Sequence, residues 1–250
     1  MNGMYMIWTG QAGFIFESPG GVRIGVDLYL TDSTERLCGF RRLSASPVRS
    51  EDCRLDMLLA THGHEDHLDV DCLKGLLKEP ETLLIGSADA ARKANESRIS
   101  PERIVSLTPG GKFEKMDVAI EAAYADHGEG CPEAIGFLLS IGRIRVYITG
   151  DTAFRPDRMA RAREFSPHYL ILPINGAFGN LGSESAAEMA RFIGAPLTIP
   201  CHFYMFREHL GDPDAFYRIM VKRVPISQTC FLSPGKVYEA GPESIENAHV

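Results

Sequence analysis

Residues 55–67 have the sequence LDMLLATHGHEDH. An apolar run typical of a buried strand leads there into three histidines and two acids. Because alternate residues of an extended segment point to one side, His62 and His64 can direct two imidazoles at one cation. Asp66 and His67, after the following bend, can reach a second cation. Three of the eight histidines of the chain lie in this segment, which favours a metal site over a polar loop with histidines clustered by chance.

The composition indicates a globular protein with one sizeable core. The chain has 250 residues, of which 44% are apolar and 24% charged, as is usual for a globular domain. Its formal net charge of −7 disfavours a nucleic-acid partner, because phosphate neutralisation needs basic residues. No signal peptide opens the chain and no apolar run approaches about 18 residues, so we expect a cytoplasmic protein without a membrane partner. The six cysteines form no CxxC pair and are expected to be reduced.

The order of expected elements favours an α/β fold with two similar halves. Each half begins as a β-meander and continues as alternating strands and helices, which predicts two sheets packed face to face with helices outside, an αββα four-layer sandwich. Residues 1–242 are expected to form this single domain and residues 243–250 a frayed tail. Residues 31–54 lose periodicity and predict a long connection. The other strands are expected at 4–8, 14–17, 22–28, 82–85, 103–107, 112–125, 135–141, 144–149, 169–174 and 197–201, with a last strand pair near 229–232 and 236–239. Helices are expected at 68–78, 87–96, 157–164, 183–194 and 213–221.

Four apolar strands of this scheme end in a residue that can bind a metal. The strand ends are followed by His62, by Asp126 and His127, by Asp151 and by His202. Strand ends along one edge of a sheet sandwich can converge, and in this way a fold gathers ligands that are distant in sequence. A polar residue after one strand is ordinary, but the four together favour a shared site.

The segment THGHEDH (residues 61–67) has the HxHxDH signature of the metallo-β-lactamase fold superfamily, and His127, Asp151 and His202 follow in the order expected for that family. The resemblance covers nearly the whole chain from residue 10 onward. Within the superfamily the chain most resembles the L-ascorbate-6-phosphate lactonases. The segments that carry this likeness are WTGQAG (8–13), VDLYL (26–30), IPCHFYMF (199–206) and GDP (211–213). Tyr204 stands where that group would carry an aspartate.

The resemblance implies how seven ligands divide between two divalent ions, zinc or manganese, with iron as a further alternative. One ion would be held by His62, His64 and His127, the other by Asp66, His67 and His202, with Asp151 between them. A shared carboxylate offsets the repulsion between adjacent cations and leaves room for a bridging hydroxide as nucleophile. Asp66 is the candidate catalytic residue, because a carboxylate at the site can orient water and handle its proton.

Other candidate residues rest on position alone. Asp27 follows a strand and is expected to accept the second N–H of a ligating histidine, although an ordinary strand-end aspartate is an equal alternative. Asn175 follows the strand 169–174 and is a candidate substrate contact, with a simple turn as the alternative. Arg207, Arg41 and Arg42 could bind an anionic group in bidentate fashion, or each could be a solvated surface arginine.

The leading hypothesis is a dinuclear metal-dependent hydrolase that opens a lactone or ester of a small metabolite, including a phosphorylated sugar. The alternative enzyme is a phosphodiesterase for a small or cyclic nucleotide, which would use the same hydroxide. A hypothesis of another class is a metal-dependent sensor without turnover. The expected partner is a small-molecule substrate, which could be anionic, and the sequence is compatible with a homo-oligomer.

Overall fold

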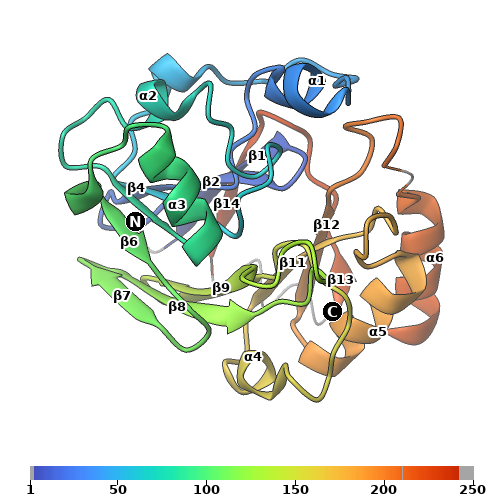
Figure 1. Cartoon of the computed structure of the whole chain (residues 1–250). Coiled ribbons are helices and arrows are strands. Elements are labelled where there is room, and N and C mark those ends of the chain that lie inside the picture. Colours follow the sequence, from blue (N-terminus) through green and yellow to red (C-terminus); the bar gives the residue numbers. More distant parts are fainter. Residues whose placement is uncertain (1–2, 210, 242–250) are drawn as a thin grey trace.

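Two seven-stranded sheets form the centre of the protein, whose structure is a computed structural model that describes residues 3–209 and 211–241 (Figure 1). In the first sheet the strand order is β14-β1-β2-β3-β4-β5-β6, and in the second it is β13-β12-β11-β10-β9-β8-β7. The first sheet consists of β1 (Met4–Gly10), β2 (Gly13–Glu17), β3 (Arg23–Val26), β4 (Met57–Ala60), β5 (Leu83–Gly86), β6 (Ile104–Ser106) and β14 (Val237–Ala240). The second consists of β7 (Lys112–Lys115), β8 (Val118–Tyr124), β9 (Ile135–Ile141), β10 (Ile144–Ile148), β11 (Tyr169–Pro173), β12 (Leu197–Cys201) and β13 (Gln228–Thr229).

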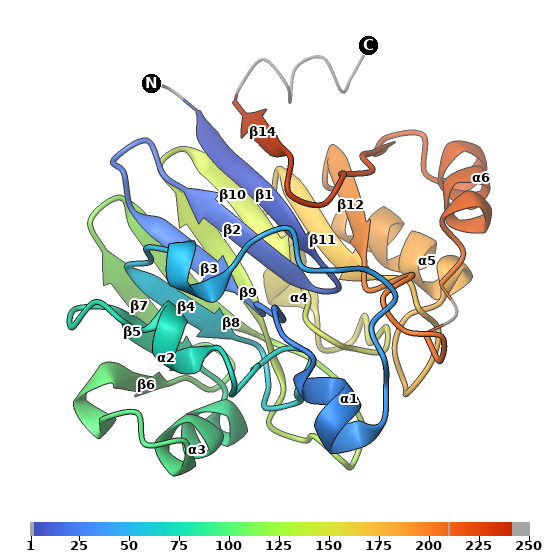
Figure 2. The same ribbon diagram turned by 90° about the horizontal axis from the view of Figure 1, so that it is seen from above.

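Helices cover the outer faces of both sheets, so the predicted αββα sandwich is confirmed (Figure 2). Helix α3 packs on β5 and β6, whereas α5 packs on β11 and α6 on β13. The α-helices of the described residues are α1 (Ser33–Cys38), α2 (Leu73–Leu76), α3 (Ala88–Glu96), α4 (Ala160–Glu164), α5 (Ser183–Ile193) and α6 (Pro213–Arg223), and there are two 3₁₀ turns, η1 (Ser50–Asp52) and η2 (Pro101–Arg103).

The central strands are apolar on both faces because each face meets a different layer. In β4, Met57 and Leu59 belong to the core between the sheets, while Leu58 and Ala60 belong to the core under α2 and α3. In β11, Ile171 belongs to the core between the sheets, and Leu170 contributes to the core under α5 and α6. A strand buried on both faces has a continuous run of apolar residues, so β4 and β11 are easy to predict from the sequence.

Several expected elements differ from the observed ones in length or pairing. The expected strand 112–125 is a hairpin of β7 and β8, which turns at Met116 with φ 53°. The expected helix 68–78 is reduced to α2, because the side chain of Asp69 accepts the backbone N–H groups of Leu30 and Thr31 and holds the preceding residues in a turn. The final two strands do not pair with each other, since β13 joins β12 and β14 joins β1. The expected tail, residues 243–250, lies outside the described residues.

Candidate metal centre

The loop after β4 carries four of the seven candidate ligands and is fixed from below by Asp27. This aspartate is fully buried and accepts hydrogen bonds from Thr61, from the backbone N–H at 2.8 Å and from the hydroxyl at 2.7 Å. Its Oδ2 also lies 2.9 Å from Nδ1 of His67. That contact requires a proton on Nδ1, so Nε2 of His67 is left to face the other ligands.

The same aspartate determines the tautomer of His62 through Thr61. The single hydroxyl proton of Thr61 is donated to Asp27, so the hydroxyl oxygen accepts from Nδ1 of His62 at 3.0 Å. Nε2 of His62 then carries a lone pair directed at the cluster. Asp27 therefore contacts His67 directly and acts on His62 through Thr61, while its role as the partner of metal-bound histidines stays a prediction.

Helix α3 holds the peptide between His62 and His64. Asp89 accepts the backbone N–H of Gly63 at 2.7 Å, and Lys93, one turn later, donates to the carbonyl of Gly63 and to Oε1 of Glu65 at 2.7 Å. A Cβ atom on Gly63 would lie 3.0 Å from the Asp89 carboxylate, so glycine allows this close approach.

The other three candidate ligands come singly from the second sheet, and they follow β8, β10 and β12. Gly150, before Asp151, has φ 63°, and a Cβ there would lie 2.8 Å from the carbonyl oxygen of Ile135. His202 also has a left-handed φ, 61°, and its backbone N–H donates to the carbonyl of Gln11 at 2.9 Å. Backbone shape at these strand ends therefore directs the side chains inward.

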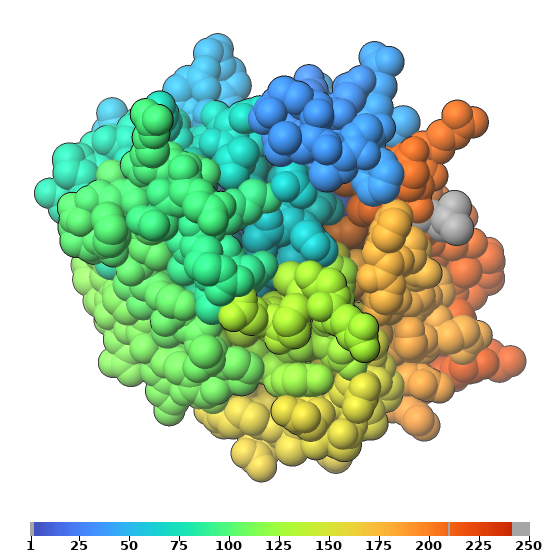
Figure 3. Space-filling model, in the orientation of Figure 1, coloured from blue at the N-terminus to red at the C-terminus, as the bar shows by residue number. Residues whose placement is uncertain are grey.

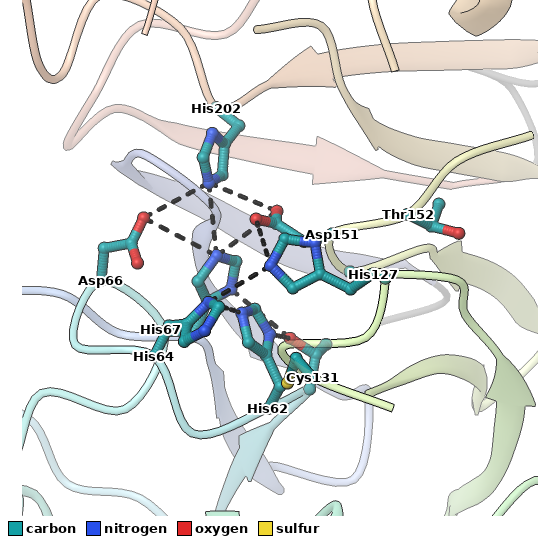
Figure 4. A network of polar contacts seen from close by, with 12 residues as sticks. His62, His64, Asp66, His67, His127, Cys131, Asp151, Thr152 and His202 are labelled. Carbon is teal, nitrogen blue, oxygen red and sulfur yellow. Dashed lines mark hydrogen bonds and ion pairs between the residues drawn. The ribbon is translucent and has the colours of Figure 1, made fainter. Parts of the chain in front are cut away.

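The seven side chains converge in three groups, of which the first and the last share no residue and the group of His62, His67 and Asp151 lies between them (Figure 4). In the first set, Nδ1 of His64 lies 2.9 Å from Nε2 of His62 and 3.2 Å from Nε2 of His127. In the last set, Nε2 of His202 lies 3.3 Å from Nε2 of His67 and 3.3 Å from Oδ2 of Asp66. Ligand bonds of about 2.0–2.1 Å in a tetrahedral arrangement place ligand atoms about 3.3 Å apart. Both sets therefore have the separation that one cation requires.

Asp151 lies between the two sets. Its Oδ1 is 3.4 Å from Nε2 of His67 and 3.3 Å from Nε2 of His202, and its Oδ2 is 3.6 Å from Nε2 of His127. Oδ1 is buried without a hydrogen-bond partner among the described residues. A buried carboxylate oxygen of this kind is costly unless a cation faces it, so this donor set fits two metal ions that share Asp151.

Charge within the cluster is arranged to receive a cation. Burial lowers the pKa of His62 well below 6.5, and the positive charge of His67 lowers it further. Burial also opposes charge on His67, but Asp151, Asp66 and Asp27 raise its pKa well above 6.5. The carboxyl groups of Asp66 and Asp151 are held well below their usual pKa of 3.8, despite their burial, by His67 and His202. The two ionised carboxylates thus draw a proton onto His67 that a metal ion would displace.

Cys131 lies beside the cluster without joining it (Figure 4). Its Sγ donates to Oδ2 of Asp89 at 3.4 Å, and burial raises its pKa to about 12. The thiol therefore stays protonated and packs as a small buried group.

A pocket of about 430 Å³ opens onto the candidate metal centre. On the face shown in Figure 3, the motif loop (teal) is bordered by the segment of α1 (blue), by the segment near residue 130 (yellow-green) and by the loop after β11 (amber). The pocket is lined by Thr34, Cys38, Phe40, His64, Glu65, Asp66, His127, Gly128, Glu129, Gly130, Asp151, Phe178, His202 and His209. No arginine or lysine occurs among these described lining residues.

The predicted substrate-binding residues do not line this pocket. Arg41 and Arg207 are exposed to solvent. Asn175 is 2% exposed and donates to the carbonyl of Ala177 at 3.4 Å. Arg42 is engaged elsewhere, since it donates to the carbonyl of Thr31 at 2.9 Å and lies over the ring of Tyr29. Their contact with a substrate stays a prediction, and the geometry gives it no support.

Two polar residues at the site were not among the predicted ones. Gln11 is fully buried in the turn between β1 and β2, and its Nε2 donates to Oδ2 of Asp66 at 2.8 Å. His209 is 5% exposed and stacks on His202 with ring centroids 4.7 Å apart. Burial and, to a smaller extent, the neighbouring His202 together lower the pKa of His209 to about 4. Gln11 lies in the segment WTGQAG that carries the resemblance, whereas for His209 the sequence leaves a place at the mouth of the site and a place in solvent as alternatives.

Backbone strain is concentrated at this site. Eight described non-glycine residues have positive φ, and four of them, Gln11, Asp27, Phe178 and His202, are candidate ligands, contact them or line the pocket. Such conformations cost about 1–3 kcal/mol each and persist where the surrounding structure enforces them. Their location indicates that the surrounding packing holds these residues in strained backbone conformations that place their side chains at the site.

Comparison with known proteins agrees with this geometry. A family model for the beta-lactamase superfamily domain matches residues 28–203. A UPF0173 metal-dependent hydrolase of Aeropyrum pernix is 28% identical over 248 residues, covering 94% of this chain and 96% of the relative. Among solved structures, the metallo hydrolase Igni18 of Ignicoccus hospitalis has a TM-score of 0.76 at 19% identity, covering 95% of this chain and 98% of the other. An isothiocyanate hydrolase from Delia radicum gut bacteria has a TM-score of 0.76 at 18% identity, covering 94% and 100%.

The chain belongs to the metallo-β-lactamase fold superfamily. It is a metal-dependent hydrolase of that superfamily. Among the described residues, no helix is long and apolar enough to cross a membrane; the cytoplasmic location stays a prediction.

Proposed function

We propose that the protein hydrolyses a small, uncharged lactone or ester at a centre of two divalent metal ions. The observation that carries this proposal is the position of Asp151, whose two carboxylate oxygens face two separate groups of ligand atoms. Imidazole-rich sites favour zinc, and the carboxylates also admit manganese or iron. Bound ions would lower the pKa of a water molecule toward about 7 and polarise a carbonyl oxygen.

The side chains of the chain itself would orient the reactants. Asp66 lines the pocket, and Gln11 fixes its Oδ2. Because its pKa is held well below the usual value by His67 and His202, against its burial, Asp66 stays ionised and can accept a hydrogen bond from the attacking water. Asp27 and Thr61 hold His62 and His67 in the tautomer that presents Nε2.

The charge of the pocket favours an uncharged substrate over a phosphorylated one. Apart from the candidate ligands, the ionisable lining groups include Glu65 and Glu129, and Glu65 is paired with Lys93 outside the pocket wall. A phosphate group would find no guanidinium or ammonium group among the described lining residues, although such groups are the usual phosphate partners. A lactone or ester therefore fits better than a sugar phosphate whose phosphate group lies away from the proposed ions.

A substrate panel on metal-loaded protein tests the proposal. Protein reconstituted with zinc, manganese or iron would be analysed for metal content and assayed with lactones, p-nitrophenyl esters, bis-p-nitrophenyl phosphate and cyclic nucleotides. We expect about two ions per chain and turnover of lactones or esters that is lost in Asp66→Asn and Asp151→Asn. Faster hydrolysis of the phosphodiesters would favour the phosphodiesterase alternative. Tight metal binding without turnover of any substrate would favour a sensor.

A further inference from the structure

One wall of the pocket consists of three aromatic side chains, Phe40, Phe178 and His209, which we name the aromatic wall. The ring centroids of Phe40 and Phe178 are 5.8 Å apart. The ring of His209 lies 6.2 Å from that of Phe40 and 5.4 Å from that of Phe178. The three residues come from the connection after α1, the loop after β11 and the loop after β12. Segments distant in sequence thus build one continuous apolar surface.

The aromatic wall adjoins the candidate metal centre and is held rigidly. His209 stacks on the candidate ligand His202 at an interplanar angle of 17°. Phe206, which is 1% exposed, supports the wall from behind, with its ring 6.1 Å from Phe40 and 4.9 Å from His209. A substrate whose reacting carbon lies near His202 must therefore place a neighbouring group against these rings.

Phe178 adopts an unfavourable conformation that the fold alone does not explain. Its φ is 54°, and its side chain is 58% exposed. A bulky residue rarely adopts a left-handed φ, and an aromatic ring left in water gives up the gain of burial. Gly176 and Gly179, with φ of 63° and 84°, shape the same loop. An apolar group of a ligand that covers the ring of Phe178 would gain the favourable free energy of burial that the exposed ring lacks.

We propose that the aromatic wall binds an uncharged aryl or alkyl substituent of the substrate, next to the bond that is broken. This inference rests on the proposed function and narrows it to lactones or esters that carry an apolar group. The lining of the pocket also contains Gly128 and Gly130, which leave room for such a group, and the exposed Glu129, which would repel an anionic one.

Three γ-lactones that differ in one substituent test the inference: γ-butyrolactone, its γ-phenyl derivative and its γ-carboxylate derivative. We expect kcat/KM of the metal-loaded enzyme to be about tenfold or more higher for the phenyl derivative than for the unsubstituted ring. Phe178→Gly and Phe40→Leu should lower kcat/KM for the phenyl derivative by a larger factor than for the unsubstituted ring, so that the preference for the phenyl group is reduced or lost. Phe231→Ala is the matched control, because Phe231 is an exposed phenylalanine (42%) that does not line the pocket.

Two further measurements separate binding from folding and from catalysis. Glycine adopts a left-handed φ without strain, so Phe178→Gly should keep or raise the thermal midpoint while it weakens substrate recognition. A γ-phenyl lactam resists hydrolysis, and calorimetry should show that its Kd rises about tenfold in Phe178→Gly, with a negative heat-capacity change for binding to the parent enzyme.

The outcomes distinguish the inference from the function on which it rests. If all lactones are hydrolysed and neither wall variant changes substituent preference or lactam affinity, the aromatic wall is not a substrate site and the proposed function stands. A preference for the carboxylate derivative also overturns the inference. If no lactone or ester is hydrolysed while the lactam binds in a wall-dependent manner, the proposed function fails and the binding site stands.

Discussion

The two sheets supply the candidate metal centre in different ways. The first sheet delivers His62, His64, Asp66 and His67 in one loop after β4, and hydrogen bonds to Asp27, Asp89 and Lys93 fix that loop. The second sheet delivers one ligand from the end of each of three strands, and the shape of the backbone at Gly150 and His202 directs them inward. A contiguous loop needs local polar support, whereas separate strand ends obtain their relative positions from the sheet itself. The two contributions meet at Asp151.

The largest effect is expected where the two contributions meet. Asp151→Ala removes the carboxylate that faces both ligand sets, so both ions should bind weakly. His64→Ala should affect mainly the set that contains His62 and His127. Metal analysis after dialysis should show that Asp151→Ala loses more bound metal than His64→Ala. The activity of Asp151→Ala should also fall by more than about 10- to 100-fold, which is the usual effect of removing a hydrogen-bond partner of a metal ligand. Equal metal loss in both variants would contradict a shared role for Asp151.

The next largest effect is expected at Asp27, whose hydrogen bonds support the loop after β4. Asp27→Asn keeps the size of the side chain but weakens the acceptor that fixes the tautomer of His67. Metal affinity or activity should fall about 10- to 100-fold, as measured by competition with a chromogenic chelator. The matched control is Asp69→Asn, a buried aspartate that accepts backbone N–H groups of Leu30 and Thr31 without contacting the cluster. The control should lower thermal stability and leave metal affinity unchanged; loss of metal affinity in both variants would point to a general folding defect.

On the side of the second sheet, His209 should make the stability of the metal-free protein depend on pH. Burial holds the pKa of its folded form at about 4, against 6.5 ordinarily. As the pH falls below 6.5, the unfolded chain takes up a proton that the folded protein does not accept until about 4, so folding is progressively disfavoured. Between pH 7 and pH 5 this amounts to about 2 kcal/mol. Urea unfolding of His209→Phe, which keeps an aromatic ring there, should show a smaller loss over this interval than the parent protein, and an equal loss would refute the assignment.

The smallest effect is expected at the contact between α3 and the motif loop. Lys93→Met retains an apolar stem but removes the donor to Gly63 and Glu65, which should cost about 1 kcal/mol of stability and weaken metal binding a few-fold. Lys78→Met is the matched control, because Lys78 donates to the exposed carbonyl of Glu51, outside the pocket lining. Metal titration and thermal melting of both variants check this, and indistinguishable variants would show that Lys93 does not support the loop.

The candidate ligands could be predicted from sequence because each follows a run of apolar residues that specifies a strand. The strands β4, β10 and β12 are almost completely buried, and strand ends along one edge of a sheet sandwich can converge, so their terminal side chains become neighbours. The substrate contacts could not be predicted in this way. Arg41 and Arg207 were selected for their charge, but they lie in irregular segments whose direction no periodicity encodes, and both are exposed.

The lengths of individual elements were also only partly predictable. The start of the expected helix 87–96 is confirmed, because Ser87 is the N-cap of α3 and its side chain accepts the N–H of Ala90, a local interaction. The hairpin turn at Met116 and the separation of β13 from β14 were not evident. Partner strands compete for the same backbone groups, and the outcome depends on the whole sheet.

The sequence by itself determined the class of fold, the position of the metal-binding loop and the identity of seven candidate ligands, because strand periodicity and ligand chemistry are local properties of the chain. Only the tertiary structure decided that Asp27 governs the tautomer of His67 directly and that of His62 through Thr61, that Gln11 reaches Asp66, and that Phe40, Phe178 and His209 form one wall. These contacts join residues from separate loops, and the packing of the whole molecule, which no local pattern records, sets the distances between them.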